Sequence, residues 1–349
     1  MTASLPDAPA GAGLGAREAE LARWRERNSL TAARYTVDRL LQLKRETVSV
    51  VLPAREVAET LGTVLDSLAP LERSGLVDEL VVVDAASRDG TAALARERGA
   101  AVVQESELLG DYGRAEGKGD AMWRGLAATS GEIVVYLDTD TRDFAERFLL
   151  GMVGPLLERP ELELVKGTFR RPLKLDGVAV PDGGGRVTEL VARPLLNLFM
   201  PELGGFGQPL AGETAARRPL LESLPYPVGY GVEIAMMIDV ARRVGPDAMA
   251  QVDLGTRQNR HQSLRNLSAM ALAVVGAASR RFGLGPAETS TAGIALPAGD
   301  GMEMRAVSLT ERPPLESVSA EAREAARAAA AAAVRPLETR GGFRAVRSR

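Results

Sequence analysis

Short apolar runs alternate with amphipathic stretches over the first half of the chain. The runs are rich in β-branched residues, have the length of buried strands, and cover residues 48–53, 80–84, 100–104 and 133–137. Apolar residues at helical spacing between them predict helices at 57–68, 91–98 and 120–128. This alternation predicts an α/β fold with a Rossmann-like, mostly parallel sheet flanked by helices.

The second half of the chain is less regular. A strand is expected at 162–166, a loop or hairpin at 172–182, and helices from 183, at 229–244 and at 269–282. One or two amphipathic helices outside the main domain are expected at 16–44, and the Ala-rich sequence from about 319 indicates a solvated or partly disordered appendage. We expect an N-terminal extension that is partly disordered and then helical (1–45), a main domain in two halves (46–150 and 151–285) and a peripheral tail (286–349).

Composition narrows the class of protein. The chain has 349 residues, of which 45% are hydrophobic and 26% charged, as in ordinary globular proteins. A net charge of −3 gives no general attraction to nucleic acid or to a membrane, and we expect neither as a partner. Cysteine is absent, and neither a signal peptide nor an apolar membrane-spanning run is found, so we expect a cytoplasmic protein. The single histidine, His261, excludes zinc sites that need two.

The strongest chemical signal is the sequence Asp138-Thr139-Asp140, which follows a predicted strand. Alternate side chains of an extended segment share a face, so the two carboxylates point the same way. Hard oxygen ligands at this edge suit Mg²⁺ or Mn²⁺ that bridges nucleotide phosphates. The alternative is an Asp-rich turn that caps the next helix. Pro53 and Asp84 also end strands, so we expect them in the same crevice.

Two glycine-containing motifs precede predicted helices. Lys118 lies between Gly117 and Gly119 and can neutralise a diphosphate, although an ordinary charged loop would look the same. The run 183–188 combines three glycines with Arg186 and Thr188. Its backbone amides and forked guanidinium suit a phosphate or carboxylate, and the alternative is a flexible loop with a surface arginine.

Two further polar stretches are candidates for ligand contacts. Tyr230 and Glu233 lie near the start of a predicted helix, where Glu233 either holds sugar hydroxyls or only complements the helix dipole. The stretch from Asp253 to His261 contains Arg257. His261 is interpreted as a metal ligand or a phosphate contact, against a structural or surface role.

These motifs together resemble the glucosyl-3-phosphoglycerate synthases of actinobacteria, over about residues 46–285. The most specific element is Gly-Gly-Gly-Arg-Val-Thr-Glu-Leu-Val-Ala-Arg-Pro-Leu-Leu at 183–196. The resemblance implies a retaining glycosyltransferase of the GT-A fold with a helical acceptor-side region. It also implies a Mg²⁺- or Mn²⁺-dependent homodimer that transfers glucose from an activated nucleotide, usually UDP-glucose, to the 2-hydroxyl of 3-phosphoglycerate.

The resemblance also implies roles for individual residues. Asp140 and His261 would bind the metal, and the catalytic residues would be Asp140, Glu233 and Arg257. The nucleotide-sugar contacts would be Pro53, Ala54, Asp84, Lys118, Asp138, Thr139, Tyr230, Glu233 and Arg257. The acceptor contacts would be Gly185, Arg186, Thr188 and Asn259.

Three departures from the family pattern lie near the nucleotide and the metal. The segment Arg55-Glu56-Val57-Ala58-Glu59 replaces an Asn-Glu-Glu cluster, and Ala85-Ala86 stands where Ser-Gly is common. Asn259 and His261 occupy each other's usual places. These changes leave open a mannosyl-3-phosphoglycerate synthase or a dual-specificity enzyme that uses GDP-mannose. Two other hypotheses are a sugar nucleotidyltransferase, whose glycine-rich signature after the first strand is missing, and a non-catalytic nucleotide-sugar binder.

Overall fold

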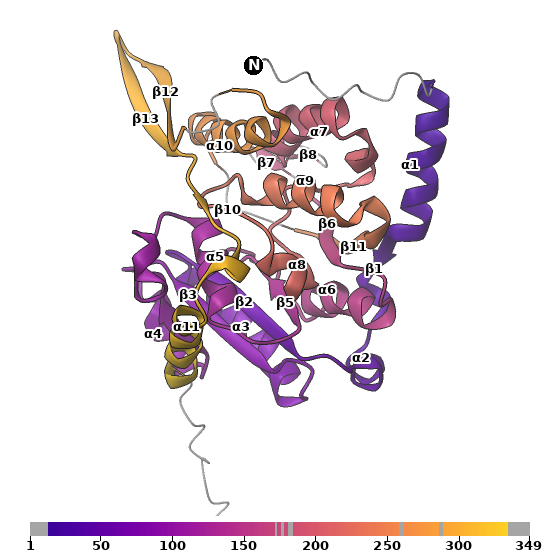
Figure 1. Cartoon of the computed structure of the whole chain (residues 1–349), viewed down its shortest axis with the longest axis vertical. Helices are drawn as coiled ribbons and strands as arrows, with labels where there is room; N and C mark the ends of the chain where they lie inside the picture. The colour runs from indigo at the N-terminus through magenta and orange to yellow at the C-terminus, as the bar shows by residue number, and fades with distance from the viewer. Residues whose placement is uncertain are drawn as a thin grey trace, which may run out of the picture.

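The computed structural model describes residues 13–171, 173–175, 178–180, 184–257, 262–285 and 289–333. Over these residues, eight strands form one sheet in the order β1-β11-β6-β9-β5-β2-β3-β4 (Figure 1). The strands are β1 (Ser29–Thr31), β2 (Val48–Ala54), β3 (Glu79–Asp84), β4 (Ala101–Gln104), β5 (Ile133–Tyr136), β6 (Leu164–Arg170), β9 (Thr214–Arg217) and β11 (Met249–Thr256). Neighbours pair in parallel except β9, which is antiparallel to β5 and β6, so the expected mostly parallel sheet is confirmed.

Helices cover both faces of this sheet, as the alternation of strands and helices predicts. Within β2, Val50 and Leu52 face one apolar core while Val51 faces the other, because successive side chains of a strand alternate. Helices α3 and α6 contribute to the first core, and α5 and α9 to the second. The helices are α1 (Leu14–Asn28), α2 (Val37–Leu43), α3 (Ala58–Arg73), α4 (Thr91–Glu97), α5 (Lys118–Ala127), α6 (Arg147–Glu158), α7 (Arg193–Phe199), α8 (Arg218–Glu222), α9 (Val232–Val244), α10 (Leu264–Phe282) and α11 (Ala320–Ala333).

Short helical turns and small sheets complete the described structure. A π-helical segment, η4 (Thr188–Ala192), runs directly into α7. The 3₁₀ turns are η1 (Ala32–Arg34), η2 (Glu105–Glu107), η3 (Gly110–Tyr112), η5 (Pro201–Gly205), η6 (Pro246–Ala248) and η7 (Leu315–Ser317). Strands β7 (Leu173–Leu175) and β8 (Val178–Val180) form an antiparallel hairpin, which is one of the two forms expected at 172–182.

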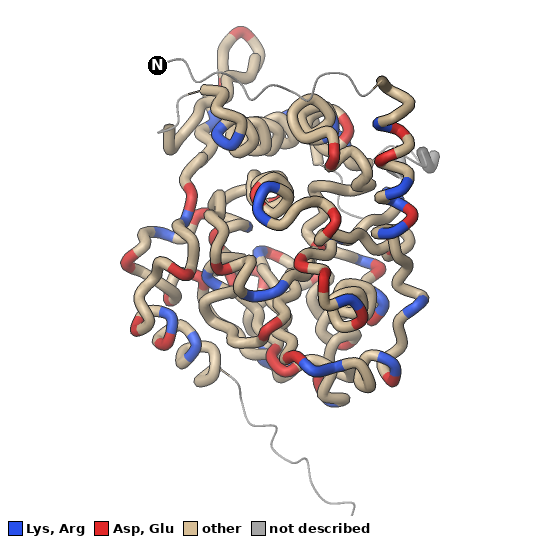
Figure 2. Tube along the Cα trace, turned by 45° about the vertical axis from the view of Figure 1, so that its right-hand side comes forward, with Lys and Arg blue, Asp and Glu red and all other residues tan. Residues whose placement is uncertain are grey.

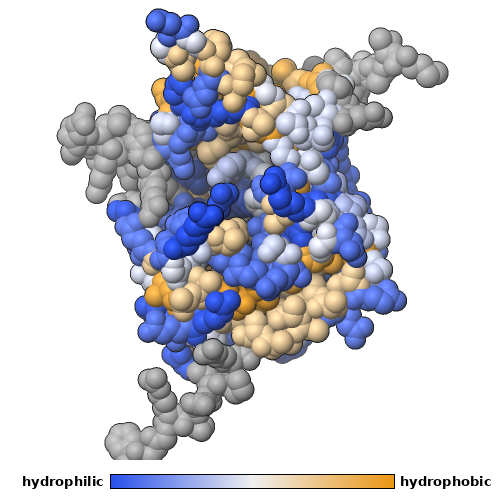
Figure 3. Space-filling view, turned by 90° about the vertical axis from the view of Figure 1, so that its left-hand side faces the viewer, coloured by the Kyte–Doolittle hydropathy of each residue, from blue (hydrophilic) through white to orange (hydrophobic). Residues whose placement is uncertain are grey.

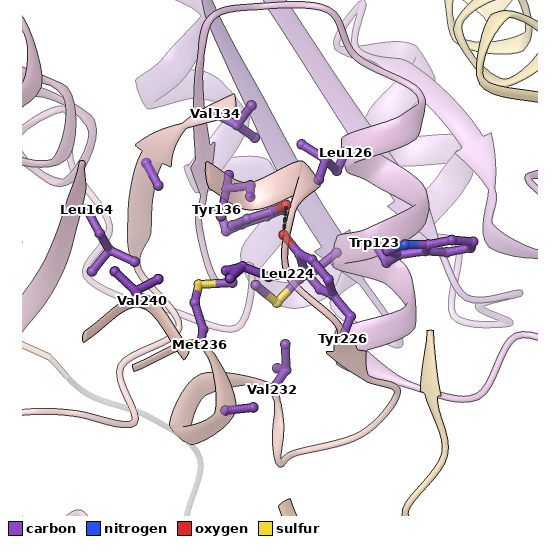
Figure 4. Close-up of a cluster of buried hydrophobic side chains, with 14 of the residues drawn as sticks. Trp123, Leu126, Val134, Tyr136, Leu164, Leu224, Tyr226, Val232, Met236 and Val240 are labelled. Atoms are coloured by element: carbon purple, nitrogen blue, oxygen red, sulfur yellow. Dashed lines mark hydrogen bonds between the residues drawn. The ribbon is translucent and has the colours of Figure 1, made fainter. Parts of the chain in front are cut away.

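The core on the α5 and α9 side includes a buried pair of tyrosines (Figure 4). The hydroxyls of Tyr136 and Tyr226 point toward one another and lie 3.3 Å apart. Leu126, Val232 and Met236 surround the pair. Each hydroxyl therefore has a partner inside an apolar cluster, which avoids the cost of an unsatisfied buried polar group.

The N-terminal extension holds the two helices expected there, together with a strand that the sequence pattern did not indicate. Strand β1 pairs in parallel with β11 and forms an edge of the main sheet. Trp24 of α1 is buried and packs against Phe206, with the two rings tilted and their centres 4.5 Å apart. This extension is therefore part of the main core and does not merely pack outside it.

The C-terminal segment also differs from the expected solvated appendage. A hairpin of β12 (Thr291–Ala298) and β13 (Gly301–Ser308) projects beyond α10 (Figure 1). The chain then returns, and β14 (Glu311–Arg312) pairs with β10 (Tyr226–Pro227). Nη2 of Arg312 lies 2.6 Å from a carboxylate oxygen of Asp120 in α5, and both side chains are buried. Apolar residues of the segment that follows are also buried, namely Leu315, Val318, Ala326 and Ala330.

Charged residues of both signs are spread over the described structure (Figure 2). Acidic and basic residues are interspersed along the trace (Figure 2). One broad face carries mainly hydrophilic residues and smaller hydrophobic patches (Figure 3). Within the described ranges, every helix is too short or too polar to span a lipid bilayer.

Candidate active site

The strands place the candidate residues at one edge of the sheet. Asp84 ends β3, Asp138 follows β5 by two residues, and Arg257 follows β11 directly. Because these strands are parallel to one another, their carboxyl ends lie at the same edge. The side chains of Asp138 and Arg257 meet there.

The Arg257 guanidinium lies at the centre of this edge. Its Nη2 donates to Oδ2 of Asp138 at 2.9 Å and to Oδ1 of Asp140 at 3.1 Å. Its Nη1 lies 2.6 and 2.8 Å from the two carboxylate oxygens of Glu213. The contacts with one guanidinium confirm that Asp138 and Asp140 point the same way. Burial opposes the charge on Arg257, but Glu213 and Asp138 outweigh burial and raise its pKa.

Lys118 joins the same cluster from the first turn of α5. Its ammonium lies 2.6 Å from Oδ1 of Asp138 and 2.8 Å from Oε1 of Glu233, which is in the first turn of α9. Burial would raise the pKa of Asp138, but the charges of Lys118 and Arg257 prevail and hold it well below its usual range. Asp138 therefore remains a carboxylate between two cations.

A second lysine lies beneath this cluster, on β6. The buried Lys166 ammonium donates to the carbonyl of Ala211 at 2.5 Å and to the hydroxyl of Thr214 at 2.8 Å. Burial lowers the pKa of Lys166 to about 8. The loop that it holds passes close to Asp138, since a Cβ built on Gly212 would lie 2.1 Å from Oδ1 of Asp138. A side chain at position 212 would therefore displace that carboxylate.

Several residues expected to contact the nucleotide hold the sheet edge together. The hydroxyl of Thr139 donates to the carbonyl of Pro53 at 2.7 Å, and the carbonyl of Thr139 accepts from Thr60 at 2.6 Å. Asp84 is buried at the end of β3 and accepts from the backbone of Ser87 and from Gln104. Ala54, at the end of β2, is buried as well. These contacts bring the end of β2 beside the Asp138-Thr139-Asp140 motif.

Ser87 and Asp89 connect the loop after β2 to the start of α4. Asp89 accepts from the backbone of Thr91, the first residue of α4, at 3.0 Å. It also accepts from the backbone of Ala58, the first residue of α3, at 2.9 Å. Ser87 accepts from the backbone of Glu56 rather than from α4. Ser87 and Asp89 therefore fasten the loop after β2.

The second glycine motif lies where η4 and α7 begin. Gly185 has a φ of +72°, a conformation that favours glycine. The Arg186 guanidinium donates to the carbonyl of Gln262 at 2.8 Å, and Thr188 is buried. Tyr230 is half-exposed just before α9. Gly183, Asn259 and His261 lie outside the described residues.

Two site residues, Glu213 and Arg171, were not indicated by the sequence. Glu213 is fully buried at the start of β9 and is the counterion of Arg257. Arg171 follows β6, and its carbonyl accepts from the backbone of Gly184 at 3.0 Å. Lys166 ends the strand predicted at 162–166 and had no expected role. Charged residues beside short apolar segments were the one available signal, because such residues are seldom buried without a partner.

The donor set at the sheet edge suits a divalent cation. Asp138 and Asp140 converge on one positively charged group, the Nη2 of Arg257, and carboxylate oxygens are the ligands that Mg²⁺ and Mn²⁺ prefer. Among the residues that the structure describes, no group of three His, Cys, Asp or Glu side chains is arranged to hold a metal. His261, expected as a ligand, is outside that set.

Comparison with known proteins places this site in a family. The model of glycosyl transferase family 2 matches residues 49–173. A glucosyl-3-phosphoglycerate synthase of Mycolicibacterium paratuberculosis is 44% identical over 306 residues, which cover 84% of this chain and 92% of that protein. The Mycobacterium tuberculosis H37Rv protein of the same name is 47% identical over 280 residues, covering 77% and 85%.

Solved structures agree with these relatives. Mannosyl-3-phosphoglycerate synthase from Rubrobacter xylanophilus matches with a TM-score of 0.77 and 47% identity, covering 85% of this chain and 99% of that one. Glucosyl-3-phosphoglycerate synthase from Mycobacterium tuberculosis, in complex with Mn²⁺, UDP and glucosyl-3-phosphoglycerate, matches with a TM-score of 0.74 and 43% identity, covering 82% and 96%. This chain therefore belongs to the glucosyl-3-phosphoglycerate synthase family of glycosyltransferases.

Proposed function

We propose that this chain transfers glucose from UDP-glucose to the 2-hydroxyl of 3-phosphoglycerate, giving glucosyl-3-phosphoglycerate with retention of configuration. The observation that carries the proposal is the Lys118 ammonium, held between Asp138 and Glu233 beside Arg257. A cation pair at the end of the strands suits a sugar diphosphate. A relative that is 43% identical has been crystallised with Mn²⁺, UDP-glucose and phosphoglyceric acid, which supports this choice of substrates.

On the donor side, each charged residue has a distinct role. Lys118 and Arg257 face the diphosphate and stabilise the charge that develops on it as the sugar leaves. Glu233 accepts from hydroxyls of the transferred sugar, and Tyr230 covers that sugar. Pro53, Ala54 and Asp84 line the base and ribose, and Asp138 orients Lys118 and Arg257. On the acceptor side, Gly185, Arg186, Thr188 and Asn259 hold 3-phosphoglycerate.

A divalent metal fits this arrangement. Asp140 would hold Mg²⁺ or Mn²⁺ with His261, and its carboxylate is half-exposed toward the crevice. When bound, the metal supplies further stabilisation of the negative charge on the departing nucleotide.

The bond that forms joins the 2-hydroxyl oxygen of the acceptor to C1 of the sugar, and the bond that breaks joins C1 to the β-phosphate oxygen. The two carboxylates nearest this position, Asp138 and Glu233, are each ion-paired with Lys118. Because ion pairing weakens a carboxylate as a nucleophile, we favour attack on the face that the nucleotide leaves, through an oxocarbenium-like state.

A second donor is supported by one comparison. The Rubrobacter xylanophilus protein that is 47% identical is a mannosyl-3-phosphoglycerate synthase. The segment Arg55–Glu59 and Ala85–Ala86 depart from the glucosyl family pattern beside the predicted base pocket. GDP-mannose is therefore the alternative donor.

The test is product formation from 3-phosphoglycerate and Mg²⁺ with UDP-glucose, GDP-glucose, ADP-glucose and GDP-mannose in parallel. We expect product with glucose donors. The anomeric configuration of the new glycosidic bond should be the same as in the donor, which would show retention. Comparable product with GDP-mannose would assign a dual-specificity enzyme. An absence of product with every donor would contradict the proposal.

We further propose a cytoplasmic homodimer in which the β12–β13 hairpin reaches the second copy. The side chains of Met302 and Met304 are exposed by 60 and 67% on this hairpin. An isolated two-stranded hairpin is only marginally stable in water, so a partner surface would stabilise it. Sedimentation of the wild type should give a dimer mass, and Met302→Lys with Met304→Lys should give a monomer. A wild-type monomer would refute this arrangement.

A further inference from the structure

One strongly basic side chain at the site has a guanidinium nitrogen without a hydrogen-bond partner in the described structure. Arg171 is largely buried just after β6, and its Nε makes no hydrogen bond. Its guanidinium lies 4.8 Å from the centre of the Phe169 ring. Burial and the neighbouring charge of Arg257 lower its pKa. The charges of Glu213, Asp138 and Asp140 oppose this lowering, but none of these carboxylates forms an ion pair with Arg171. The guanidinium is therefore suited to pair with an anion from a ligand.

The surroundings of Arg171 place it at the acceptor motif. Its carbonyl accepts from the backbone of Gly184 at 3.0 Å. A Cβ built on Gly185 would lie 3.9 Å from Cδ of Arg171 and 3.7 Å from Oε1 of Gln208. The Gln208 oxygen is also buried without a hydrogen-bond partner. A hydrogen-bond donor, Nε of Arg171, and an acceptor, Oε1 of Gln208, thus lie near Gly185. Neither atom has a hydrogen-bond partner within the described structure.

Arg171 also lies near the cluster that is proposed to bind the sugar donor, because it shares the Phe169 ring with Arg257. Arg257, which contacts Asp138 and Asp140, lies 5.2 Å from the centre of the same Phe169 ring. In 3-phosphoglycerate the carboxylate is bonded directly to the carbon that carries the reacting hydroxyl, whereas the phosphate is one carbon farther away. The cation nearer the donor therefore suits the carboxylate, and Arg186 suits the phosphate.

We propose that Arg171 binds the acceptor carboxylate and positions the adjacent hydroxyl for transfer. This inference rests on the proposed function, because it takes 3-phosphoglycerate as the acceptor. A guanidinium and a carboxylate form a forked pair of charge-assisted hydrogen bonds. The pair would fix the rotation of the acceptor about its central carbon and would neutralise the buried charge.

The test is Arg171→Met, with Arg171→Lys as a second variant and Arg170→Met as the matched control, since Arg170 is the exposed neighbour. Calorimetry measures binding of 3-phosphoglycerate, and of glycerol 3-phosphate, which lacks the carboxylate. Arg171→Met should weaken 3-phosphoglycerate binding by about 10- to 100-fold, the value of hydrogen bonds to charged groups. It should leave glycerol 3-phosphate binding and the KM for UDP-glucose unchanged, and Arg171→Lys should recover part of the loss.

Thermal unfolding separates this role from a structural one. Without substrates, Arg171→Met should unfold at the wild-type temperature or above, because it removes a largely desolvated charge that forms no ion pair with a described carboxylate. A lower unfolding temperature, or equal losses for the two acceptors, would overturn the proposal. Binding that depends on Arg171 without any sugar transfer would support this inference while contradicting the proposed function.

Discussion

The carboxylate of Glu213 lies 2.6 Å from Nη1 of Arg257, and both side chains are completely buried. Glu213 directly precedes the antiparallel strand β9, whereas Arg257 follows the parallel strand β11. The other end of the guanidinium reaches Asp138 and Asp140. The ion pair therefore sets the position from which Arg257 acts on the two aspartates.

Replacement of Glu213 by alanine should leave a buried cation with fewer partners. Loss of one member of a buried pair typically costs about 3–5 kcal/mol, and we expect a decrease of about 3 kcal/mol in the free energy of unfolding. Glu213→Gln should lose less stability, because it keeps the shape of the side chain and one hydrogen-bond acceptor. Urea unfolding measures both, and Asp247→Ala in the exposed pair with Arg27 is the control. An unchanged unfolding midpoint for Glu213→Ala would contradict this role.

Much of the sheet could be predicted because its strands are continuous apolar runs. β2, β3 and β5 each bury almost every residue, and their sequences are dominated by valine, leucine and isoleucine. β9 could not be found in this way, since it reads Thr-Ala-Ala-Arg and has no such pattern. β1 has three residues and exists because β11 offers it an edge. Whether such strands form depends on their pairing in the folded sheet rather than on local propensity.

The candidate site was predictable only where a strand end marks it. Asp138, Asp140 and Lys118 follow apolar runs or precede helices, so their local sequence reveals them. Glu213 pairs with a residue 44 positions away, and Asp138 with one 119 positions away. The sequence next to these residues does not indicate which remote residue each one will contact. The folded topology creates both contacts.

Replacement of Asp140 by asparagine should remove a metal ligand with little loss of stability, because this carboxylate is 46% exposed. We expect turnover to fall by about 100-fold or more, given the several kcal/mol that a bound metal supplies. Calorimetry with Mn²⁺ should show weakened metal binding. Asp247→Asn, the same chemical change at a distant exposed site, should behave as the wild type. Normal turnover of Asp140→Asn at saturating metal would reject the metal assignment.

Replacement of Gly212 by alanine should displace the Asp138 carboxylate, since the added Cβ would lie 2.1 Å from Oδ1. The displaced carboxylate would lose its contacts with Lys118 and Arg257, so we expect turnover to fall by at least about 10-fold, as when one transition-state contact is lost. Gly229→Ala is the matched control, because a Cβ there would meet nothing within 4 Å. Steady-state kinetics compares the two. Equal activities would show that the loop carrying residue 212 moves aside.

Glu105 gives a pH dependence that is separate from the active site. Burial, followed by the charge of Asp120, raises the pKa of Glu105 to about 7 from 4.5. Between these values the folded chain binds more protons than the unfolded chain, so this contribution to stability is complete below pH 4.5 and is lost as the pH rises through 7. The loss can reach about 3 kcal/mol, at 1.36 kcal/mol for each unit of pKa.

Replacement of Glu105 by glutamine removes this titration without changing the shape of the side chain. The free energy of unfolding of the variant should match that of the wild type near pH 5. Near pH 8 it should exceed that of the wild type by up to about 3 kcal/mol, which follows from the same pKa shift. Urea unfolding at the two pH values measures the difference, and other titrating groups cancel between the proteins. Glu107→Gln, at the exposed position two residues along, should show no such difference. If the free energies of unfolding of Glu105→Gln and the wild type differ by the same amount at both pH values, Glu105 stays charged when folded.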